Sequence, residues 1–402
     1  MPGPGEADLL AIVAPRPQAA DLVRRAWDAG EAVTVIDPST PPVAVGRLLD
    51  ALAPTHLVDA EGRRPRPGGV PVPAGTAAVV VTSGTTGTPK GVELTDAGAT
   101  AIGRGWAEAI GHDADDHWFV CLPLHHVAGL AILARARVTG ARVTVVQEFS
   151  IESVGAAPGT LGATLVSVVP TMLGRLLDAG VAMHEFRGVI AGGAPLPPAL
   201  RARAVEAGVT VYDAYGQSET WGGCVANGIP IPGATARLGP SDEIELAGAM
   251  IMRAYRRDPQ ATQRAFTDDG WLRTGDVGRI ADDGRLEVVD RMRDLVITGG
   301  VNVSPVEVEQ VLAEHPAVAD IAVIGAPDAE WGERVVAHVV PTDPSSPPTL
   351  DALRAFARER LTAPKLPREL VLVPAVPRSP GGKILRRELR PPPPEPPPAP
   401  AR

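Results

Sequence analysis

The chain has 402 residues, more than one compact core of ordinary size accommodates, so two or three structural units are expected. Its formal net charge is −9 and its aromatic content is only 3%, which argues against a nucleic-acid groove and against base-stacking surfaces. The two cysteines, Cys121 and Cys224, are too few for a disulfide framework and suit a reducing cytoplasm.

Residues 76–240 alternate short β-branched runs with helical patterns. No basic segment precedes the apolar run at the N-terminus and no apolar stretch approaches about 18 residues, so we expect neither a signal peptide nor membrane insertion. Residues 7–60 read as one or two βα units. Further strands are predicted at 77–83, 117–123, 142–147, 164–170, 187–193 and 209–216, and helices at 94–111, at 126–140 and after Pro170. Near-continuous apolar strands separated by helices predict a large, layered α/β domain with mainly parallel sheets.

The pattern changes after about residue 240. Residues 242–255 and 285–290 predict antiparallel strands of a β-rich subdomain. A small α+β unit follows, with strands at 318–325, 334–340 and 369–373, a helix opened by Ser304 and Pro305, and a helix at 350–361. We therefore predict a large N-terminal domain over 1–290, a small mobile C-terminal domain over 291–390, and a disordered proline-rich tail over 391–402.

The segment 82–91, TSGTTGTPKG, combines glycines, hydroxyls and one lysine directly after an apolar strand. It lacks the Walker pattern, which requires a glycine immediately before the lysine, because Pro89 precedes Lys90. Glycines allow backbone N–H groups to approach an anion closely, and the hydroxyls and Lys90 add further donors. The segment therefore predicts a phosphate-binding loop, and the alternative is a flexible surface turn.

Four further stretches accompany this loop in a fixed order. They are PLHHVAG (123–129), GGAPLP (192–197) with YGQSET (215–220), WLRTGDVGRI (271–280) leading into 290–309, and PRSPGGKILRREL (377–389). The ordered set resembles the adenylate-forming superfamily, which includes acyl-CoA synthetases, peptide-synthetase adenylation domains and luciferases. The resemblance covers residues 75–390. It implies ATP-dependent activation of a carboxylic acid, with magnesium, followed by transfer to a thiol such as that of coenzyme A.

The resemblance also implies roles for individual residues. The β- and γ-phosphates of ATP would be held by Thr82, Ser83, Gly84, Thr85, Thr86 and Lys90. The adenine would lie on Gly192, Gly193 and Ala194 and against Tyr215 and Gly216. Ser218, where relatives usually have threonine, would meet the α-phosphate, and Glu219 would bind magnesium. Asp276 would hold the ribose, with Arg291 as a further ribose or phosphate contact.

The resemblance assigns catalytic and conformational roles to a second set of residues. Lys383 matches the lysine that reaches from the small domain to the carboxylate and the α-phosphate, where a positive charge stabilises the transition state. His126 matches the histidine beside the acyl carboxylate, whereas His125 reads as a packing residue. Gly299 and Gly300 would line the CoA tunnel. Arg293 would be the hinge, although relatives usually have aspartate or lysine there.

Within the superfamily the chain resembles the o-succinylbenzoate–CoA ligases of menaquinone biosynthesis, on residues 124–143, 218–233 and 297–309 and on its short N-terminal segment. The acid of that subgroup carries a second carboxylate on its aromatic ring, and Arg135 could bind it bidentately. Gly222 and Gly223 would leave room for the ring. The alternatives are that Arg135 extends to solvent, as expected of Arg137, and that the two glycines form a simple turn.

Two other functions remain open on the sequence. The chain could be another acyl- or aryl-CoA ligase, or it could be a stand-alone adenylation enzyme that loads a carrier protein. A non-catalytic binder is disfavoured because Lys383, Glu219 and Asp276 are all present. The expected partners are small molecules, namely the acid, ATP and CoA; a homodimer is one option that the sequence leaves open.

Overall fold

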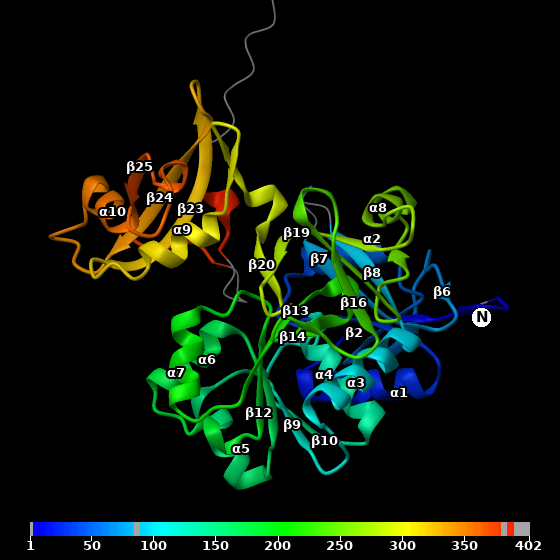
Figure 1. Cartoon of the computed structure of the whole chain (residues 1–402). Coiled ribbons are helices and arrows are strands. Elements are labelled where there is room, and N and C mark those ends of the chain that lie inside the picture. Colours follow the sequence, from blue (N-terminus) through cyan, green and yellow to red (C-terminus); the bar gives the residue numbers. More distant parts are fainter. Residues whose placement is uncertain (1–2, 84–88, 379–383, 390–402) are drawn as a thin grey trace, which may run out of the picture. The chain divides into compact units, whose positions relative to one another are not determined.

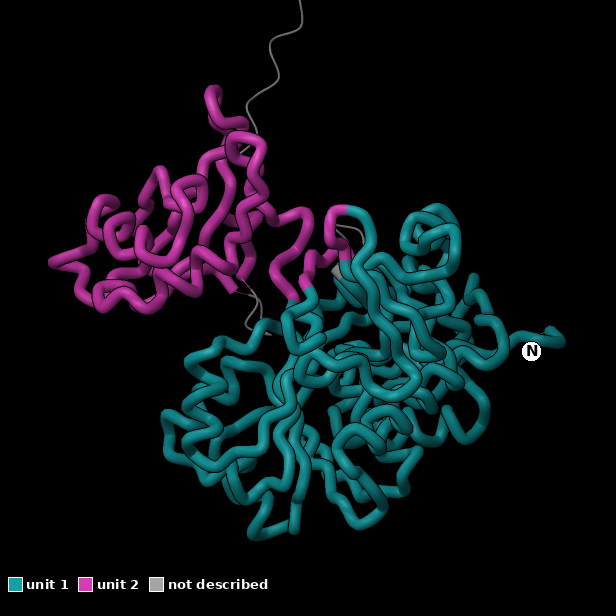
Figure 2. The backbone as a smooth tube through the Cα atoms, viewed as in Figure 1, with its two compact units in different colours: residues 1–240, 244–274, 280–287 teal, residues 241–243, 275–279, 288–402 magenta. Residues whose placement is uncertain are grey.

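A computed structural model describes residues 3–83, 89–378 and 384–389 (Figure 1). The chain divides into two compact units, coloured separately in Figure 2. The first comprises residues 1–240, 244–274 and 280–287, and the second comprises residues 241–243, 275–279 and 288–402. Within the described ranges, none of the helices has the length and apolar character needed to cross a membrane.

The first unit contains a seven-stranded sheet that begins as two βα units. Parallel strands β2, β3 and β4 alternate with helices α1 and α2, as the pattern of residues 7–60 predicts. β7 joins β3 in parallel, and β8 then turns back antiparallel to β7. In spatial order the strands are β18 (Ala254–Tyr255), β8 (Pro89–Thr95), β7 (Thr76–Ser83), β3 (Ala32–Ile36), β2 (Leu9–Val13), β4 (His56–Asp59) and β5 (Gly62–Pro65), with helices α1 (Arg16–Asp28) and α2 (Pro42–Leu52).

A second seven-stranded sheet follows, and its first five strands are parallel, as predicted. Its last two strands return antiparallel and place the glycines of 222–223 beside β13. The order is β10 (Arg142–Val145), β9 (His117–Val120), β11 (Leu165–Val168), β12 (Gly188–Gly192), β13 (Val211–Gln217), β14 (Gly222–Ala226) and β15 (Ile229–Pro230).

Helices α3 (Asp96–Ile110) and α4 (Val127–Thr139) lie between the two sheets. α3 contacts β7 and β8 of one sheet and β14 of the other, and it packs extensively on α4. Their apolar side chains join one core with strands of both sheets, which gives the layered α/β architecture that the sequence predicts (Figure 1). The other face of the second sheet carries a separate core beneath α5 (Ile151–Leu161), α6 (Pro170–Asp178) and α7 (Pro198–Glu206).

The remaining β-structure agrees with the predicted β-rich segment. A four-stranded sheet has the order β16 (Ala234–Leu238), β17 (Glu243–Gly248), β19 (Leu272–Ile280) and β20 (Leu286–Arg291). Short strands β1 (Glu6–Ala7) and β6 (Val72–Pro73) pair with each other, and α8 spans Pro259–Ala265. Short 3₁₀ turns are η1 (Met183–Glu185), η2 (Ser218–Thr220), η3 (Pro240–Asp242), η4 (Met292–Asp294), η5 (Ala363–Lys365) and η6 (Arg386–Glu388).

The second unit is the predicted small α+β fold. Its strands run in the order β22, β21, β24 and β23, and β25 lies parallel to β24. The Ser304 side chain caps α9 by accepting a hydrogen bond from the Glu307 backbone, with Pro305 at the first helical position. The bounds are β21 (Val296–Thr298), β22 (Val301–Val303), β23 (Val318–Asp328), β24 (Gly332–Pro341), β25 (Glu369–Leu372), α9 (Pro305–Leu312) and α10 (Leu350–Ala357).

Three local predictions were wrong or incomplete. Strand β8 was read as the end of the phosphate loop, because Gly91 resembles loop sequence although it pairs with Val81. The strand structure predicted over 242–255 is interrupted: β17 ends at Gly248, where a φ of 142° redirects the chain, and β18 occupies only Ala254–Tyr255. Helices α5 and α7 were not predicted: α5 contains Pro158, and α7 begins at Pro198, directly after Pro197, where proline is tolerated in the first turn.

Candidate active site

The predicted phosphate loop connects two antiparallel strands. Thr82 at the end of β7 pairs with Lys90 at the start of β8, and both residues are half-buried. The other predicted ligands, Gly84, Thr85 and Thr86, lie outside the described residues, as does the side chain of Ser83. The described part of the hairpin therefore supplies one hydroxyl and one ammonium group beside the loop.

Lys90 and Glu219 both contact Tyr255, a residue that was not predicted from the sequence. The Tyr255 hydroxyl donates a hydrogen bond of 2.7 Å to Glu219 Oε1, and Lys90 Nζ lies 5.0 Å from the Tyr255 ring centroid. Burial and the neighbouring Glu219 carboxylate raise the pKa of Tyr255, so the hydroxyl stays a donor. The only available signal was pairing: Tyr255 lies opposite Val92 of β8, two residues from Lys90.

Glu219 suits a magnesium ion by its chemistry. Mg²⁺ prefers hard oxygen ligands and commonly takes one or two carboxylates, with the remainder from phosphates and water. No group of three or more acidic, histidine or cysteine side chains is gathered for a metal in the part of the chain that the structure describes. A single carboxylate beside a phosphate loop fits an ion that arrives with a nucleotide.

The predicted adenine shelf lies at the carboxyl ends of two neighbouring parallel strands. Gly192 ends β12 and pairs with Ala214 of β13, directly before Tyr215. A Cβ on Gly192 would lie 2.9 Å from the Ala214 carbonyl, and one on Gly216 would lie 1.9 Å from the Gly222 carbonyl. Glycine is therefore required at both positions. The structure brings the predicted adenine residues together, with Gly193 and Ala194 following β12 and Ser218 following β13.

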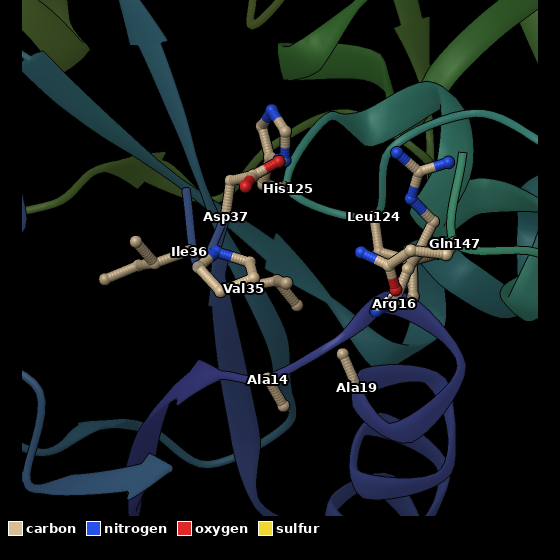
Figure 3. Close-up of a pocket in the computed structure, with 10 residues that line it drawn as sticks. Ala14, Arg16, Ala19, Val35, Ile36, Asp37, Leu124, His125 and Gln147 are labelled. Carbon is tan, nitrogen blue, oxygen red and sulfur yellow. Dashed lines mark hydrogen bonds and ion pairs between the residues drawn. The ribbon is translucent and has the colours of Figure 1, made fainter. Parts of the chain in front are cut away.

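His126 occupies the N-cap position of α4, next to His125, and its side chain makes no capping hydrogen bond. The two rings are 4.2 Å apart, and His125 Nδ1 lies 3.5 Å from the Asp37 carboxylate at the end of β3 (Figure 3). Dehydration of the ring by the surrounding protein and the proximity of His125 lower the pKa of His126 to about 4, although the residue retains exposed surface. His126 is thus neutral at pH 7, and the sequence analysis missed Asp37 as the partner of its neighbour.

The predicted acid-binding residues gather between α4 and β14. Arg135 is only 4% exposed, and its Cζ lies 4.5 Å from the Trp106 ring centroid. Trp106 in turn donates a hydrogen bond of 2.7 Å to the Gly223 carbonyl. A Cβ on Gly222 would lie 3.8 Å from Ala131, one helical turn before Arg135. The alternative of a solvent-exposed Arg135 was therefore wrong.

The second unit holds the other predicted residues. The buried carboxylate of Asp276 pairs with Arg291 Nε at 2.7 Å. Arg293 lies in η4 with a half-exposed side chain, 3.9 Å from Asp294. Gly299 and Gly300 form the turn between β21 and β22 with φ of 57° and 77°. Lys383 lies outside the described residues.

Two family models together match most of the chain. Residues 10–253 match the AMP-binding enzymes, and residues 307–383 match the AMP-binding enzyme C-terminal domain. The chain therefore belongs to the AMP-binding enzyme family.

Several named proteins are similar to this chain over most of its length. A protein of Mycobacterium tuberculosis named "Probable 2-succinylbenzoate–CoA ligase" is 38% identical over 323 residues, which cover 78% of this chain and 83% of that protein. The 2-succinylbenzoate–CoA ligase of Bacillus cereus strain Q1 is 34% identical over 347 residues, covering 78% and 69%. The o-succinylbenzoate CoA synthetase MenE of Bacillus subtilis, solved with the acyl-adenylate OSB-AMP, superposes with a TM-score of 0.84 at 28% identity, covering 95% and 88%.

Proposed function

We propose that the protein is an ATP-dependent 2-succinylbenzoate–CoA ligase of the AMP-forming type. The acid, also called o-succinylbenzoate, would react through its succinyl carboxylate with ATP to give an acyl-adenylate and pyrophosphate. CoA would then displace AMP, and the product would serve menaquinone biosynthesis. The observation that carries the choice of acid is Arg135, a buried guanidinium that lies against aromatic rings rather than carboxylates of the described chain. Such a cation suits the second carboxylate of the substrate.

The first half-reaction is chiefly a matter of positioning and charge. Thr82, Lys90 and the intervening loop would hold the departing phosphates, and Gly192 and Tyr215 would hold the base. Magnesium bound with ATP would neutralise phosphate charge, with Glu219 as its protein ligand and Tyr255 orienting that carboxylate. Neutral His126 can lie beside the reacting carboxylate without trapping it in an ion pair.

We propose further that the two halves of the chain divide the work near residue 290. The large domain would bind ATP and the acid. The small domain would bring Lys383 to the α-phosphate during adenylation, and then turn about Arg293 to present Gly299 and Gly300 to the pantetheine of CoA. Asp276 and Arg291, paired in this structure, would hold the ribose beside this hinge.

Pyrophosphate release from the purified protein with ATP, magnesium and CoA tests the proposal. The acids would be 2-succinylbenzoate, its analogue without the ring carboxylate (4-oxo-4-phenylbutanoate), benzoate, a medium-chain fatty acid and acetate. We expect CoA-dependent turnover with 2-succinylbenzoate to exceed that with every other acid. Preference for another acid would retain adenylation and reject the substrate, whereas adenylation without CoA transfer would favour a carrier-protein acceptor.

A further inference from the structure

Arg135 is held in an unusual setting for a cation. It lies on α4, whose residues 129–136 are all buried, and its Nε has no hydrogen-bond partner. Its guanidinium lies against two indole rings, with Cζ 4.5 Å from the Trp106 centroid and 5.8 Å from the Trp118 centroid. Burial lowers the pKa of Arg135 to about 9, which still leaves the side chain charged at pH 7.

The two indoles are fixed independently of Arg135. Both rings are fully buried, and they come from α3 and β9. Trp106 donates a hydrogen bond to the carbonyl of Gly223 on β14, the strand that carries the predicted acid-binding glycines. Trp118 donates its indole N–H to His112 Nε2 at 3.1 Å. Because guanidinium groups stack favourably on indole faces, two immobile rings restrict where the charge of Arg135 can lie.

The hydrogen bond from Trp118 also determines the tautomer of His112. An indole nitrogen can only donate, so His112 Nε2 must be the unprotonated nitrogen. The ring proton is therefore on Nδ1, which lies 3.0 Å from Asp116 Oδ2 and donates to it. Burial lowers the pKa of His112 against the opposing effect of Asp116, so the ring is neutral at pH 7.

Asp116 is anchored by groups far away in the sequence. Arg187 donates to both of its oxygens, at 3.0 Å and 2.6 Å, and the Thr164 hydroxyl donates at 2.7 Å. Although burial opposes ionisation, these bonds and that from His112 hold the pKa of Asp116 well below its usual range. A permanently ionised Asp116 therefore fixes His112, and His112 fixes Trp118.

We propose that Trp106 and Trp118, the latter oriented by His112 and Asp116, are positioning residues that make the acid site select a second carboxylate. The two rings hold the guanidinium of Arg135 in the core beside α3 and β9, where no carboxylate of the described chain pairs with it, and Trp106 links this position to β14. An aromatic acid with a ring carboxylate would complete the pair. This inference rests on the proposed function, since it explains how that substrate is told apart from the same acid without its ring carboxylate.

The test measures how strongly the enzyme prefers an acid with a ring carboxylate over the same acid without it. The measured quantity is the ratio of kcat/KM for 2-succinylbenzoate to kcat/KM for 4-oxo-4-phenylbutanoate. Trp118→Phe retains an aromatic face and removes the N–H, and we expect it to lower the ratio about tenfold with the KM for ATP unchanged. The matched control is Trp271→Phe, because Trp271 also stacks on an arginine, Arg237, at 4.3 Å, but belongs to neither the α4 nor the β14 face. It should leave the ratio within about twofold.

Two substitutions of His112 separate positioning from folding. His112→Leu removes the hydrogen bonds to Asp116, Trp118 and the Thr139 hydroxyl, and it should lower the ratio at least as much as Trp118→Phe. His112→Gln can accept from Trp118 and donate to Asp116, so it should restore most of the ratio. If these variants do not fold, Trp106→Phe, which loses the bond to Gly223, carries the same test from the other indole.

An unchanged ratio in folded Trp118→Phe and Trp106→Phe would overturn the inference. Equal losses for both acids would assign the network a structural role and overturn it as well. A wild-type protein that does not use 2-succinylbenzoate would instead reject the proposed function.

Discussion

Arg135 and Arg137 lie two residues apart on α4, and their side chains have different surroundings. Both lie near the end of the same apolar helix, yet Arg135 is buried against Trp106, whereas Arg137 is partly exposed and pairs with Asp96 at 2.6 Å. Because α4 is covered by α3 and by the second sheet, its apolar residues occupy all sides and no periodicity marks the inward face. The resemblance selected Arg135, but only the fold supplies its surroundings.

The first prediction concerns the cost of keeping this charge buried. Arg135→Met fills similar volume without charge, so it should raise the free energy of unfolding by about 1–3 kcal/mol, as replacing buried charges often does. The same change should raise the KM for 2-succinylbenzoate at least about tenfold while the KM for ATP stays within about twofold. Urea unfolding and steady-state kinetics check the two parts.

Arg137→Met is the control for that prediction. Its side chain is exposed and paired at the surface, so both stability and KM should change little. A loss of stability in Arg135→Met would show that the stacking on Trp106 outweighs the burial of charge. An unchanged KM for the acid would remove Arg135 from the acid site.

At the scale of elements, the correct predictions are the strands and helices that are specified by the pattern of their own residues. The parallel strands of the second sheet, α3, and α9 with Ser304 and Pro305 are all as expected. Strand β8 was missed because its pairing with β7 is specified by the partner strand and not by its own composition. The Asp116 network was missed for the same kind of reason, since Arg187 lies 71 residues away.

The second prediction concerns the link between α9 and the segment that precedes the C-terminal tail. Glu309 of α9 accepts two hydrogen bonds from Arg386 Nη2, at 2.7 Å and 2.8 Å, and one from the Val323 backbone. Burial raises the pKa of Glu309 to about 7 despite Arg386. A carboxyl group with a raised folded-state pKa binds more protons when folded, so its contribution to stability falls as pH rises from about 4.5 to 7.

Glu309→Gln removes this titration and keeps the shape of the side chain. Between pH 4.5 and 7.5 the wild type should lose up to roughly 3 kcal/mol more stability than the variant, because each pKa unit corresponds to about 1.4 kcal/mol. Amide hydrogen exchange in α9 measures this locally in the intact chain. Parallel pH profiles for the two proteins would mean that Glu309 ionises normally when folded.

At the scale of the whole molecule, the ordered motifs predicted a two-part enzyme more fully than they predicted its contacts. The family match over 10–253 and 307–383 spans the five stretches in their expected order. The described fold gathers Lys90, Glu219 and the β12–β13 glycines within the first unit. Motifs specify chemistry at their own positions, whereas supporting residues such as Tyr255 and Trp118 depend on the packing of distant segments.

The chain contains only three lysines among 38 basic residues. One of them serves below as the control for the last prediction, which concerns another. Lys90 lies beside Tyr255, and Lys365 pairs with Glu307 at 2.6 Å. Lys383 is the third, and the resemblance assigns it to the adenylation step. Arginine is not equivalent at such a position, because the compact ammonium group acts as a point charge.

Lys383→Ala should therefore lower acyl-adenylate formation by about 100-fold or more, the usual effect of removing a group that stabilises transition-state charge. Thioester formation from supplied acyl-adenylate and CoA should stay within about threefold, because a different face of the small domain would serve that step. Lys365→Ala, in the same unit, should leave both half-reactions within about twofold, since its ion pair is partly exposed. Equal losses in the two half-reactions of Lys383→Ala would contradict a domain that turns between them and would favour a single closed arrangement for both steps.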